Sequence, residues 1–319
     1  MKIVVLDGKM LNPGDLSWEA LKKLGEVTIY DRTGNDQIVS RIGDAEIVLT
    51  NKTPIRRETL DQVNNLRYIS VLATGFDVVD IKYASKKRIT VSNAPAYSTN
   101  SVAQMVFALL LEICHQVGDH NQKTKEGKWS RSIDFSFWDH PLYELKDKTM
   151  GIIGFGQIGR QTADIALAFG MNVLVATRTV DKALEKSGLS FVSLEKLYSN
   201  SDVISLHCPA TDSTKEMINM DTISKMKKGV ILINTARGAL VAEEDLAEAL
   251  KTGHIAYAAV DVLSKEPADI NNPLLQAPNC FITPHIAWAT KEARQRLMDI
   301  TVKNVVEFQG GHPVNVVNS

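Results

Sequence analysis

The sequence is poor in the features that mark secreted and disulfide-bonded proteins. Its 319 residues include only three cysteines, Cys114, Cys208 and Cys280, which are scattered and lack the spacing of metal ligands. We expect free thiols in a reducing compartment and no metal site. The amino terminus, MKIVVLDGKML, carries charged and turn-forming residues where a signal peptide needs an apolar core. A cytoplasmic protein is therefore expected.

An excess of charge of one sign is also missing, and so is a long apolar run. The 36 Lys and Arg residues nearly balance the 37 Asp and Glu residues, and the net charge is -1. This balance gives no electrostatic reason to expect a nucleic acid or a membrane as a partner. The most apolar segment, residues 102–114, is too short to span a bilayer and contains Gln104 and Glu112. It is predicted to be a helix buried on most sides, between domains or between subunits.

What the chain does have is an alternation of short apolar strands with helices. Its length suggests two domains. Strands are predicted at residues 2–6, 27–30, 46–49, 68–72 and 89–91, and then at 149–153, 172–176, 203–206, 230–233, 256–260 and 280–282. Helices lie between them, and a long helix over residues 101–117 leads from the first group to the second. The pattern predicts two doubly wound α/β units with parallel sheets, and a ligand-binding cleft between them.

The most informative motif is KTMGIIGFGQIGR at residues 148–160. A G-x-G-x-x-G turn, Gly154, Gly156 and Gly159, follows a strand and opens an amphipathic helix, as a dinucleotide-binding turn requires. The first glycine permits the turn, the second lets the backbone approach a pyrophosphate, and the third lets the helix pack on the strand. The free N–H groups at the helix start, at Gln157 and Ile158, are expected to face the phosphates.

The end of the next strand bears on which dinucleotide is used. NAD-specific sites place an acidic residue about 20 positions after the glycine turn. Here the strand ends in Thr177, Arg178 and Thr179, and the nearest acid, Asp181, lies past it. A hydroxyl and a guanidinium suit a 2′-phosphate, so the sequence predicts an NAD(P) site that accepts NADP, with NAD use left open. The alternative is that Arg178 stacks on adenine or points to solvent.

Three titratable residues follow predicted strands of this second unit. Arg237 lies in ILINTARGAL, Glu266 in GHIAYAAVDVLSKEP and His285 in TPHIAWAT. Each alone has an ordinary explanation, as a surface ion pair, a loop or a turn. Because parallel strands end at the same edge of a sheet, all three are expected at the edge that bears the glycine turn.

These motifs together resemble the D-isomer-specific 2-hydroxyacid dehydrogenase family. GFGQIG, NTARGALV, the AVDV…EP run and TPHIA occur in the family's order and at its separations, and the resemblance covers essentially the whole chain. It implies a Rossmann cofactor domain at residues 100–287 and a flavodoxin-like substrate domain formed by residues 1–99 and 288–319. It also implies that Arg237, Glu266 and His285 are the catalytic residues.

Reduction of a 2-keto acid needs a hydride donor, a proton donor and a cation for the carboxylate. Arg237 suits the last role because its planar fork binds carboxylates in a bidentate manner. An imidazole with a pKa of about 6.5 is only about one quarter protonated at pH 7. We therefore expect Glu266 to orient His285 and raise its pKa, with His285 acting as acid in reduction and as base in oxidation.

The resemblance implies further contacts by matching motif. It implies that His207, Cys208 and Pro209 contact the adenosine half of the cofactor. It also implies cofactor contacts by Thr235 and Ala236, which precede Arg237, and by Asp261 at the nicotinamide carboxamide. Substrate is expected at the loop after residues 68–72, through Thr74 and Gly75, for which an ordinary turn is the alternative. Asn51 and Lys52 are a weaker candidate, equally well explained as a solvated loop.

Within the family, HIAWAT with Trp288 and the connection WSRSIDFSFWDHPLYEL most resemble the glycerate dehydrogenase or hydroxypyruvate reductase branch. Hydroxypyruvate and glyoxylate are the implied substrates. A phosphoglycerate or D-lactate-type dehydrogenase is an alternative, and a cofactor-sensing corepressor is one of a different class. The family is commonly dimeric through the cofactor domain, which implies a homodimer with the helix after Ser101 at the interface and Trp138 near the partner's site.

Overall fold

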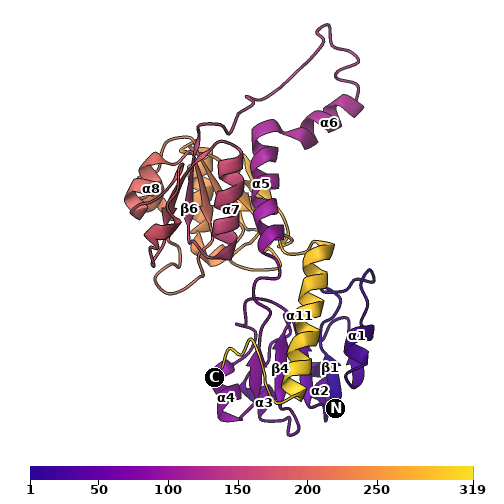
Figure 1. Cartoon of the computed structure of the whole chain (residues 1–319). Helices are drawn as coiled ribbons and strands as arrows, with labels where there is room; N and C mark the ends of the chain where they lie inside the picture. The colour runs from indigo at the N-terminus through magenta and orange to yellow at the C-terminus, as the bar shows by residue number, and fades with distance from the viewer. Residues whose placement is uncertain (319) are drawn as a thin grey trace. The chain divides into compact units, whose positions relative to one another are not determined.

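The computed structural model describes residues 1–318 and divides the chain into two compact units (Figure 1). Unit 1 consists of Met1–Ser98 and the segment from Trp288 onward. Unit 2 consists of Thr99–Ala287. Each unit is built around its own parallel sheet, as the alternating pattern of the sequence predicts.

The sheet of unit 1 has five strands in the order β2-β1-β3-β4-β5. They are β1 (Lys2–Val5), β2 (Glu26–Ile29), β3 (Ile47–Thr50), β4 (Tyr68–Val71) and β5 (Thr90–Ser92). All of the pairings are parallel. This order is that of flavodoxin-like sheets, so the predicted fold of the first domain is confirmed. Every residue of β3 and β4 is buried, because helices cover both faces of the sheet.

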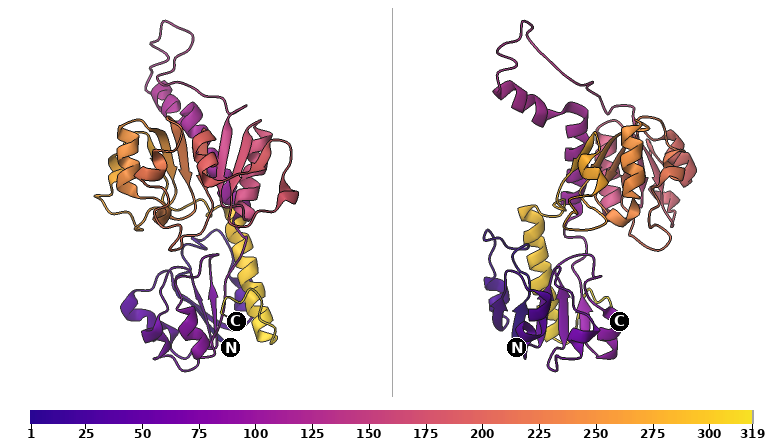
Figure 2. Two further views of the ribbon diagram at one scale, coloured as in Figure 1. Left: turned by 90° about the vertical axis from the view of Figure 1, so that its left-hand side faces the viewer. Right: turned by 180° about the vertical axis from the view of Figure 1, so that it is seen from behind.

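The helices of unit 1 come from both ends of the chain. They are α1 (Glu19–Lys22), α2 (Ile38–Ile42), α3 (Arg57–Leu60), α4 (Ile81–Lys86) and α11 (Lys291–Gln309), with a 3-10 turn, η1 (Asn35–Gln37), before α2. The last helix, α11, lies along the sheet formed by the first hundred residues (Figure 2). Phe308 of α11 stacks on Tyr68 of β4 with ring centroids 4.3 Å apart. The C-terminal segment therefore contributes to the core of the N-terminal sheet.

The sheet of unit 2 has seven strands in the order β12-β11-β10-β9-β6-β7-β8. They are β6 (Thr149–Ile153), β7 (Asn172–Ala176), β8 (Leu189–Phe191), β9 (Val203–Leu206), β10 (Val230–Asn234), β11 (Ile255–Val260) and β12 (Cys280–Ile282). Every pairing is parallel. The chain runs outward from β6 to β8 and then returns to β9 on the other side, which is the Rossmann order with one added strand. The predicted Rossmann domain is thus confirmed.

The helices of unit 2 are α5 (Thr99–His115), α6 (Val117–Lys125), α7 (Gln157–Ala168), α8 (Leu194–Asn200), α9 (Met220–Ile223) and α10 (Glu243–Lys251). Three 3-10 turns, η2 (Lys182–Leu184), η3 (Gly238–Leu240) and η4 (Pro273–Gln276), complete the unit. The predicted buried helix is α5, whose Val106, Phe107 and Leu110 lie in a core with residues of β6 and α7. Among residues 1–318 no single helix is long and apolar enough to cross a membrane. Helices α5 and α6, which are bent at their junction, reach that length and composition only when they are taken together.

Three elements differ from the sequence prediction. The helix expected to reach residue 117 ends at His115, because Gln116 adopts a left-handed conformation with φ 46°, and a second helix, α6, continues at an angle of 54°. Helix α6 was not predicted, since VGDHNQKTK has no apolar face; the pair Asp119 and Lys123, four residues apart and 2.6 Å from each other, supports it instead. Strand β8, with the sequence LSF, was also missed, because the polar Ser190 interrupts its apolar run.

Candidate active site

The glycine turn after β6 has the geometry of a phosphate cradle. Gly154 has φ +96°, and a Cβ added there would lie 2.7 Å from the backbone N of Cys208, so the turn packs on the loop after β9. A Cβ added at Gly159 would lie 2.2 Å from the carbonyl oxygen of Gly154. Gly156 faces open space, with nothing within 4 Å of such a Cβ, and it caps α7 without a side-chain hydrogen bond. The N-terminus of α7 therefore has room and backbone donors for a diphosphate.

A buried hydroxyl without a partner lies at the end of β10. The Oγ1 atom of Thr235 has no hydrogen-bond partner in the described structure, although the residue is only 8% exposed. Such a group costs free energy unless a ligand or water satisfies it. Thr235 and the open turn at Gly156 are therefore chemically suited to a polar ligand.

The loop after β9 carries His207, Cys208 and Pro209 beside this turn. The Nε2 atom of His207 lies 2.9 Å from Oγ of the buried Ser205, and burial lowers the pKa of His207 to about 4. The imidazole is therefore neutral at pH 7. Burial also raises the pKa of the Cys208 thiol, whose Sγ lies 3.7 Å from Sδ of Met217. Cys208 is thus a thiol packed on sulfur rather than a thiolate nucleophile.

The residues after β7, which the sequence predicts at the ribose, differ in their exposure. Thr177 is half-buried, whereas Arg178 and Thr179 are exposed. Asp181 is engaged locally, since its Oδ1 accepts the backbone N–H of Ala183 at 3.1 Å and caps η2. A guanidinium and two hydroxyls therefore stand where an NAD-specific site has a carboxylate.

His285 and Glu266 are in direct contact. The Nδ1 atom of His285 lies 2.6 Å from Oε2 of Glu266, and Oε1 of Glu266 accepts the backbone N–H of Leu263 at 3.1 Å. Both side chains retain access to solvent, with 29% and 34% of their surfaces exposed. The two residues are 19 positions apart, and the fold brings them together because β11 and β12 are neighbours.

The turn that carries His285 is held by Asp261, which is 1% exposed at the end of β11. The Oδ1 atom of Asp261 accepts the Thr283 hydroxyl at 2.5 Å and the backbone N–H of Ile286 at 2.9 Å, and Oδ2 accepts that of Ala287 at 2.8 Å. The backbone N–H of His285 donates to the carbonyl of Asp261 at 2.8 Å. His285 itself has φ 54°, uncommon for a residue with a side chain, and these bonds hold it there.

Arg237 lies exposed in the loop after β10, and the buried Asn234 fixes this loop. The Asn234 side chain donates to the carbonyl of Arg237 at 2.8 Å and accepts the backbone N–H of Ala236 at 3.0 Å. The guanidinium Nη1 of Arg237 donates to the carbonyl of Ala236 at 2.7 Å. The strand ends are aligned, because Asn234 pairs with Val260 and Val260 pairs with Ile282. Arg237, Glu266 and His285 thus follow three adjacent strands at one edge of the sheet.

The candidate substrate loops of unit 1 are fixed by hydrogen bonds of their own. The Thr74 hydroxyl donates to the carbonyl of Ala94 at 3.0 Å, and Nδ2 of Asn93 donates to the carbonyl of Thr74 at 2.7 Å. Gly75, which follows Thr74, is half-buried. In the weaker candidate pair, Asn51 is buried and its amide donates to the carbonyl of Leu72, whereas Lys52 is exposed. The Asn51 amide therefore holds the end of β3 to the loop after β4.

Sequence reasoning missed the polar residues that hold these loops. Asn234 and Glu243 were not singled out, nor was Asp7, whose buried carboxylate accepts the backbone N–H groups of residues 51–53. Their one sequence signal is a polar side chain at the end of an apolar strand or the start of a helix. Among residues 1–318, no group of three or more His, Cys, Asp or Glu residues is arranged to hold a metal ion.

Comparison with known proteins agrees with this geometry. The NAD binding domain of D-isomer specific 2-hydroxyacid dehydrogenases matches residues 107–287. The chain is 54% identical to the hydroxypyruvate reductase of Blautia hydrogenotrophica, with 100% of both chains covered. It is 41% identical to the glycerate dehydrogenase of Methylorubrum extorquens, with 100% of this chain and 99% of the relative covered. The structure resembles an acyclic imino acid reductase (Bsp5) in complex with NADPH and D-Arg, with a TM-score of 0.85, 30% identity and coverage of 99% and 100%.

The chain therefore belongs to the D-isomer specific 2-hydroxyacid dehydrogenase family. It is an oxidoreductase that acts on the CH–OH group of small hydroxy acids with a nicotinamide cofactor, and it resembles the hydroxypyruvate reductase and glycerate dehydrogenase branch.

Proposed function

We propose that the protein reduces hydroxypyruvate to D-glycerate and glyoxylate to glycolate, with NAD(P)H as the hydride donor. The observation that carries the proposal is the 2.6 Å contact between His285 Nδ1 and Glu266 Oε2, because it supplies an oriented proton donor at the edge of the sheet that bears the glycine turn. The 54% identity to a hydroxypyruvate reductase over the whole chain supports the choice of substrate. It also favours an enzyme over a corepressor.

His285 is the acid in reduction and the base in oxidation. With Nδ1 bonded to Glu266, the proton on Nδ1 is kept and the ring exchanges its proton with the substrate oxygen at Nε2. The Glu266 carboxylate stabilises the imidazolium by direct attraction between opposite charges and fixes the plane of the ring. Arg237 binds the substrate carboxylate through its planar fork.

The cofactor supplies the hydride when it is bound to unit 2. We assign its diphosphate to the glycine turn and its ribose to the residues after β7, and the remaining contacts to the loops after β9, β10 and β11. These residues are Gly154, Gly156, Gln157, Ile158 and Gly159, then Thr177, Arg178 and Thr179, and then His207, Cys208, Pro209, Thr235, Ala236 and Asp261. Because Arg178 replaces the usual carboxylate, NADPH is accepted as well as NADH.

Residues 100–287 form the dinucleotide-binding domain in this proposal, and residues 1–99 with 288–319 form the substrate domain. The loop after β4 binds the substrate carboxylate through Thr74 and Gly75. Its support is the fixed conformation of that loop, which Asn93 bonds at the carbonyl of Thr74. The three cysteines form no disulfide, which suits a cytoplasmic enzyme.

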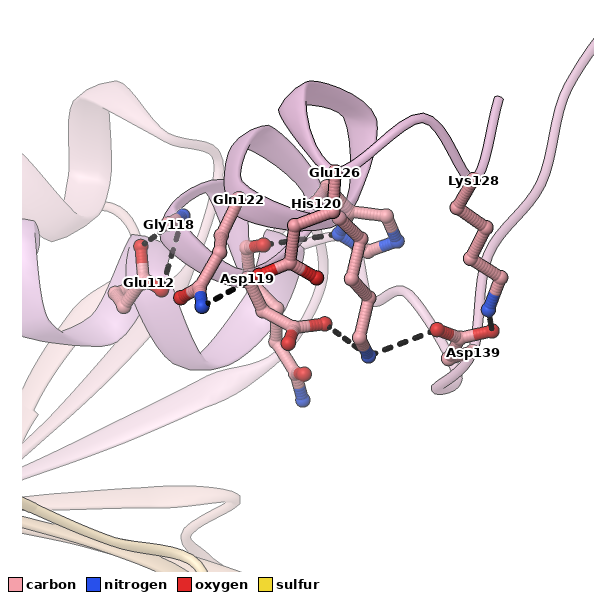
Figure 3. A network of polar contacts seen from close by, with 10 residues as sticks. Glu112, Gly118, Asp119, His120, Gln122, Glu126, Lys128 and Asp139 are labelled. Carbon is pink, nitrogen blue, oxygen red and sulfur yellow. Dashed lines mark hydrogen bonds and ion pairs between the residues drawn. The ribbon is translucent and has the colours of Figure 1, made fainter. Parts of the chain in front are cut away.

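The proposed partner is a second copy of the chain, bound through the arm, which we define as residues 117–143. The arm extends from the sheet of unit 2 (Figures 1 and 2). Ion pairs join some of its charged groups, since Lys123 lies 2.6 Å from Asp119 and 2.8 Å from Asp139 (Figure 3). Lys123 and Lys128 hold the pKa of Asp139 at about 2.

Apolar side chains of the arm remain exposed, among them Val117, Trp129, Ile133, Phe135, Trp138 and Leu142. A hollow of ≈ 580 Å³ beside α6 is lined by Trp138 and Leu142 together with His115 and His120. Exposed apolar surface of this kind favours association, and a symmetric dimer would cover it twice. Analytical ultracentrifugation should show a dimer that Trp138→Glu weakens; a monomeric, fully active wild type would contradict this assignment.

The reaction is tested by substituting His285 and by a substrate panel. His285→Ala should lower kcat about 10² to 10⁴-fold, the usual contribution of a general acid or base. The exposed His312, replaced by alanine, is the control and should retain wild-type turnover. In the panel, kcat/KM with NADPH and with NADH should be highest for hydroxypyruvate, then glyoxylate. A preference for pyruvate or for phosphohydroxypyruvate would replace the proposal with the D-lactate-type or phosphoglycerate alternative.

A further inference from the structure

Glu243, the first residue of α10, is bonded to the segment that contains Glu266. Its Oε1 atom accepts the backbone N–H of Ser264 at 2.7 Å. Its Oε2 atom accepts the hydroxyl of Ser264 at 2.7 Å and Nδ2 of Asn272 at 2.8 Å. One half-buried carboxylate thus receives three donors from a segment more than 20 positions away. Hydrogen bonds to a charged acceptor are stronger than those between neutral groups.

These donors lie on both sides of Glu266. Ser264 precedes it, and Asn272 follows it at the end of the same loop. Asn272 is 7% exposed, and its Oδ1 accepts the backbone N–H of Leu274 at 3.0 Å, where η4 begins. Glu243 therefore ties the start of the 264–272 segment to its buried end.

The base of the segment is closely packed against the loop after β10. A Cβ added at Gly238, beside Arg237, would lie 1.9 Å from the carbonyl carbon of Leu263, so the two loops pack backbone against backbone. The backbone N–H of Leu263 in turn donates to Oε1 of Glu266. Leu263 thus holds the Glu266 carboxylate directly, and Glu243 holds Ser264, the residue next to Leu263.

We propose that Glu243 is a positioning residue that holds Glu266 against His285 by clamping residues 264–272. The inference rests on the proposed roles of Glu266 and His285. Glu243 acts through Glu266 and not on substrate or cofactor. A catalytic group misplaced by about 1 Å can cost on the order of 10² in rate, and residues that orient catalytic or metal-binding groups typically contribute about 10- to 100-fold.

The competing explanation is that Glu243 only stabilises α10, because an acidic residue in the first turn interacts favourably with the helix dipole. Glu244 lies in the same first turn and is exposed. Glu244→Ala is therefore a matched control, since it removes a charge from the same helix end and leaves the clamp intact.

The first measurement compares Glu243→Ala, Glu243→Gln and Glu244→Ala. Glu243→Ala should lower kcat for hydroxypyruvate about 10- to 100-fold while the Kd for NADPH, from fluorescence titration, changes less than about twofold. Glu243→Gln keeps an acceptor for Ser264 and should recover part of the loss. Glu244→Ala should match wild type in kcat. Equal losses for Glu243→Ala and Glu244→Ala would reduce Glu243 to a stabiliser of the helix and overturn the inference.

The deciding measurement is a double-mutant cycle with Glu266→Gln. If Glu243 acts through Glu266, adding Glu243→Ala to Glu266→Gln should lower kcat by less than about twofold. The same fold-loss in both backgrounds would overturn the positioning role, even with Glu266→Gln itself impaired. Wild-type turnover of Glu266→Gln alone would instead overturn the proposed function, so the two failures are distinct.

A milder variant serves if Glu243→Ala fails to fold. Ser264→Ala removes one of the three donors at an exposed position. It should lower kcat by about two- to tenfold and lose this effect in the Glu266→Gln background. An effect of equal size in both backgrounds would contradict the clamp.

Discussion

The carboxylate of Asp261 accepts the backbone N–H of Ala287 at 2.8 Å, and a buried charge at the end of β11 thereby fixes the turn that contains His285. In Asp261→Asn, an amide NH2 would face one of the donors and leave it unsatisfied. We expect a loss of about 1–3 kcal/mol in the free energy of unfolding, together with lower kcat. Urea unfolding and steady-state kinetics measure both, and Thr283→Val, which removes one donor, should cost less. An unchanged urea midpoint in Asp261→Asn would contradict this account of the turn.

Substitution of Glu266 should slow the reduction of hydroxypyruvate. Glu266→Gln keeps a hydrogen-bond acceptor beside Nδ1 of His285 but removes the charge that stabilises the imidazolium. Asp261, the other carboxylate near this turn, is taken up by Thr283 and the backbone. The kcat for hydroxypyruvate should therefore fall by at least about tenfold. Glu244→Gln should match wild type in kcat, and wild-type turnover of Glu266→Gln would contradict the role given to the Glu266 carboxylate.

Cofactor preference should depend on Arg178. Because its guanidinium is exposed directly after β7, Arg178→Ala should raise the KM for NADPH about tenfold and leave the KM for NADH within about twofold. Parallel titrations of both cofactors at saturating hydroxypyruvate give the comparison, and Lys196→Ala, at an exposed position of α8, is a control for loss of charge. A wild type that strongly prefers NADH would contradict the role given to Arg178.

His207 should make the fold sensitive to acid. Burial lowers the pKa of His207 to about 4, against an ordinary value of about 6.5 in the unfolded chain. Below about pH 6.5 His207 is protonated in the unfolded state but stays neutral in the folded state. The free energy of unfolding therefore decreases as the pH falls toward 4. The loss is on the order of 2 kcal/mol. His207→Gln should lack this component, and urea midpoints of both proteins between pH 4.5 and 8 should converge or cross on the acid side. Parallel curves would contradict it.

The sheets were predictable because their signal is local. Apolar runs of three to five residues separated by helical segments located all strands except β8, and the ends of parallel strands then placed Arg237, Glu266 and His285 at one edge. Helix α6 was not predicted because its sequence is polar and ion pairs stabilise it. Such pairs produce no periodic pattern of apolar residues.

The contacts that hold the loops could not be read from the sequence. Asn272 and Glu243 are 29 positions apart, and no pattern in either segment predicts that the two side chains form a hydrogen bond. The same holds for Asp261 and Ala287, where a resemblance to the family suggested a cofactor contact for Asp261 but not its bonds to the His285 turn. Such pairs follow from the register of neighbouring strands, which only the folded chain defines.

The strand order of unit 2 has a practical consequence for engineering. The segment proposed to recognise the ribose follows β7, on one flank of β6, whereas the groups proposed for proton transfer and carboxylate binding follow β10, β11 and β12 on the opposite flank. No strand is shared between the two sets. Replacing the segment after β7 with one that discriminates nucleotides differently should thus change which reduced cofactor is used. The residues proposed for proton transfer would remain as they are.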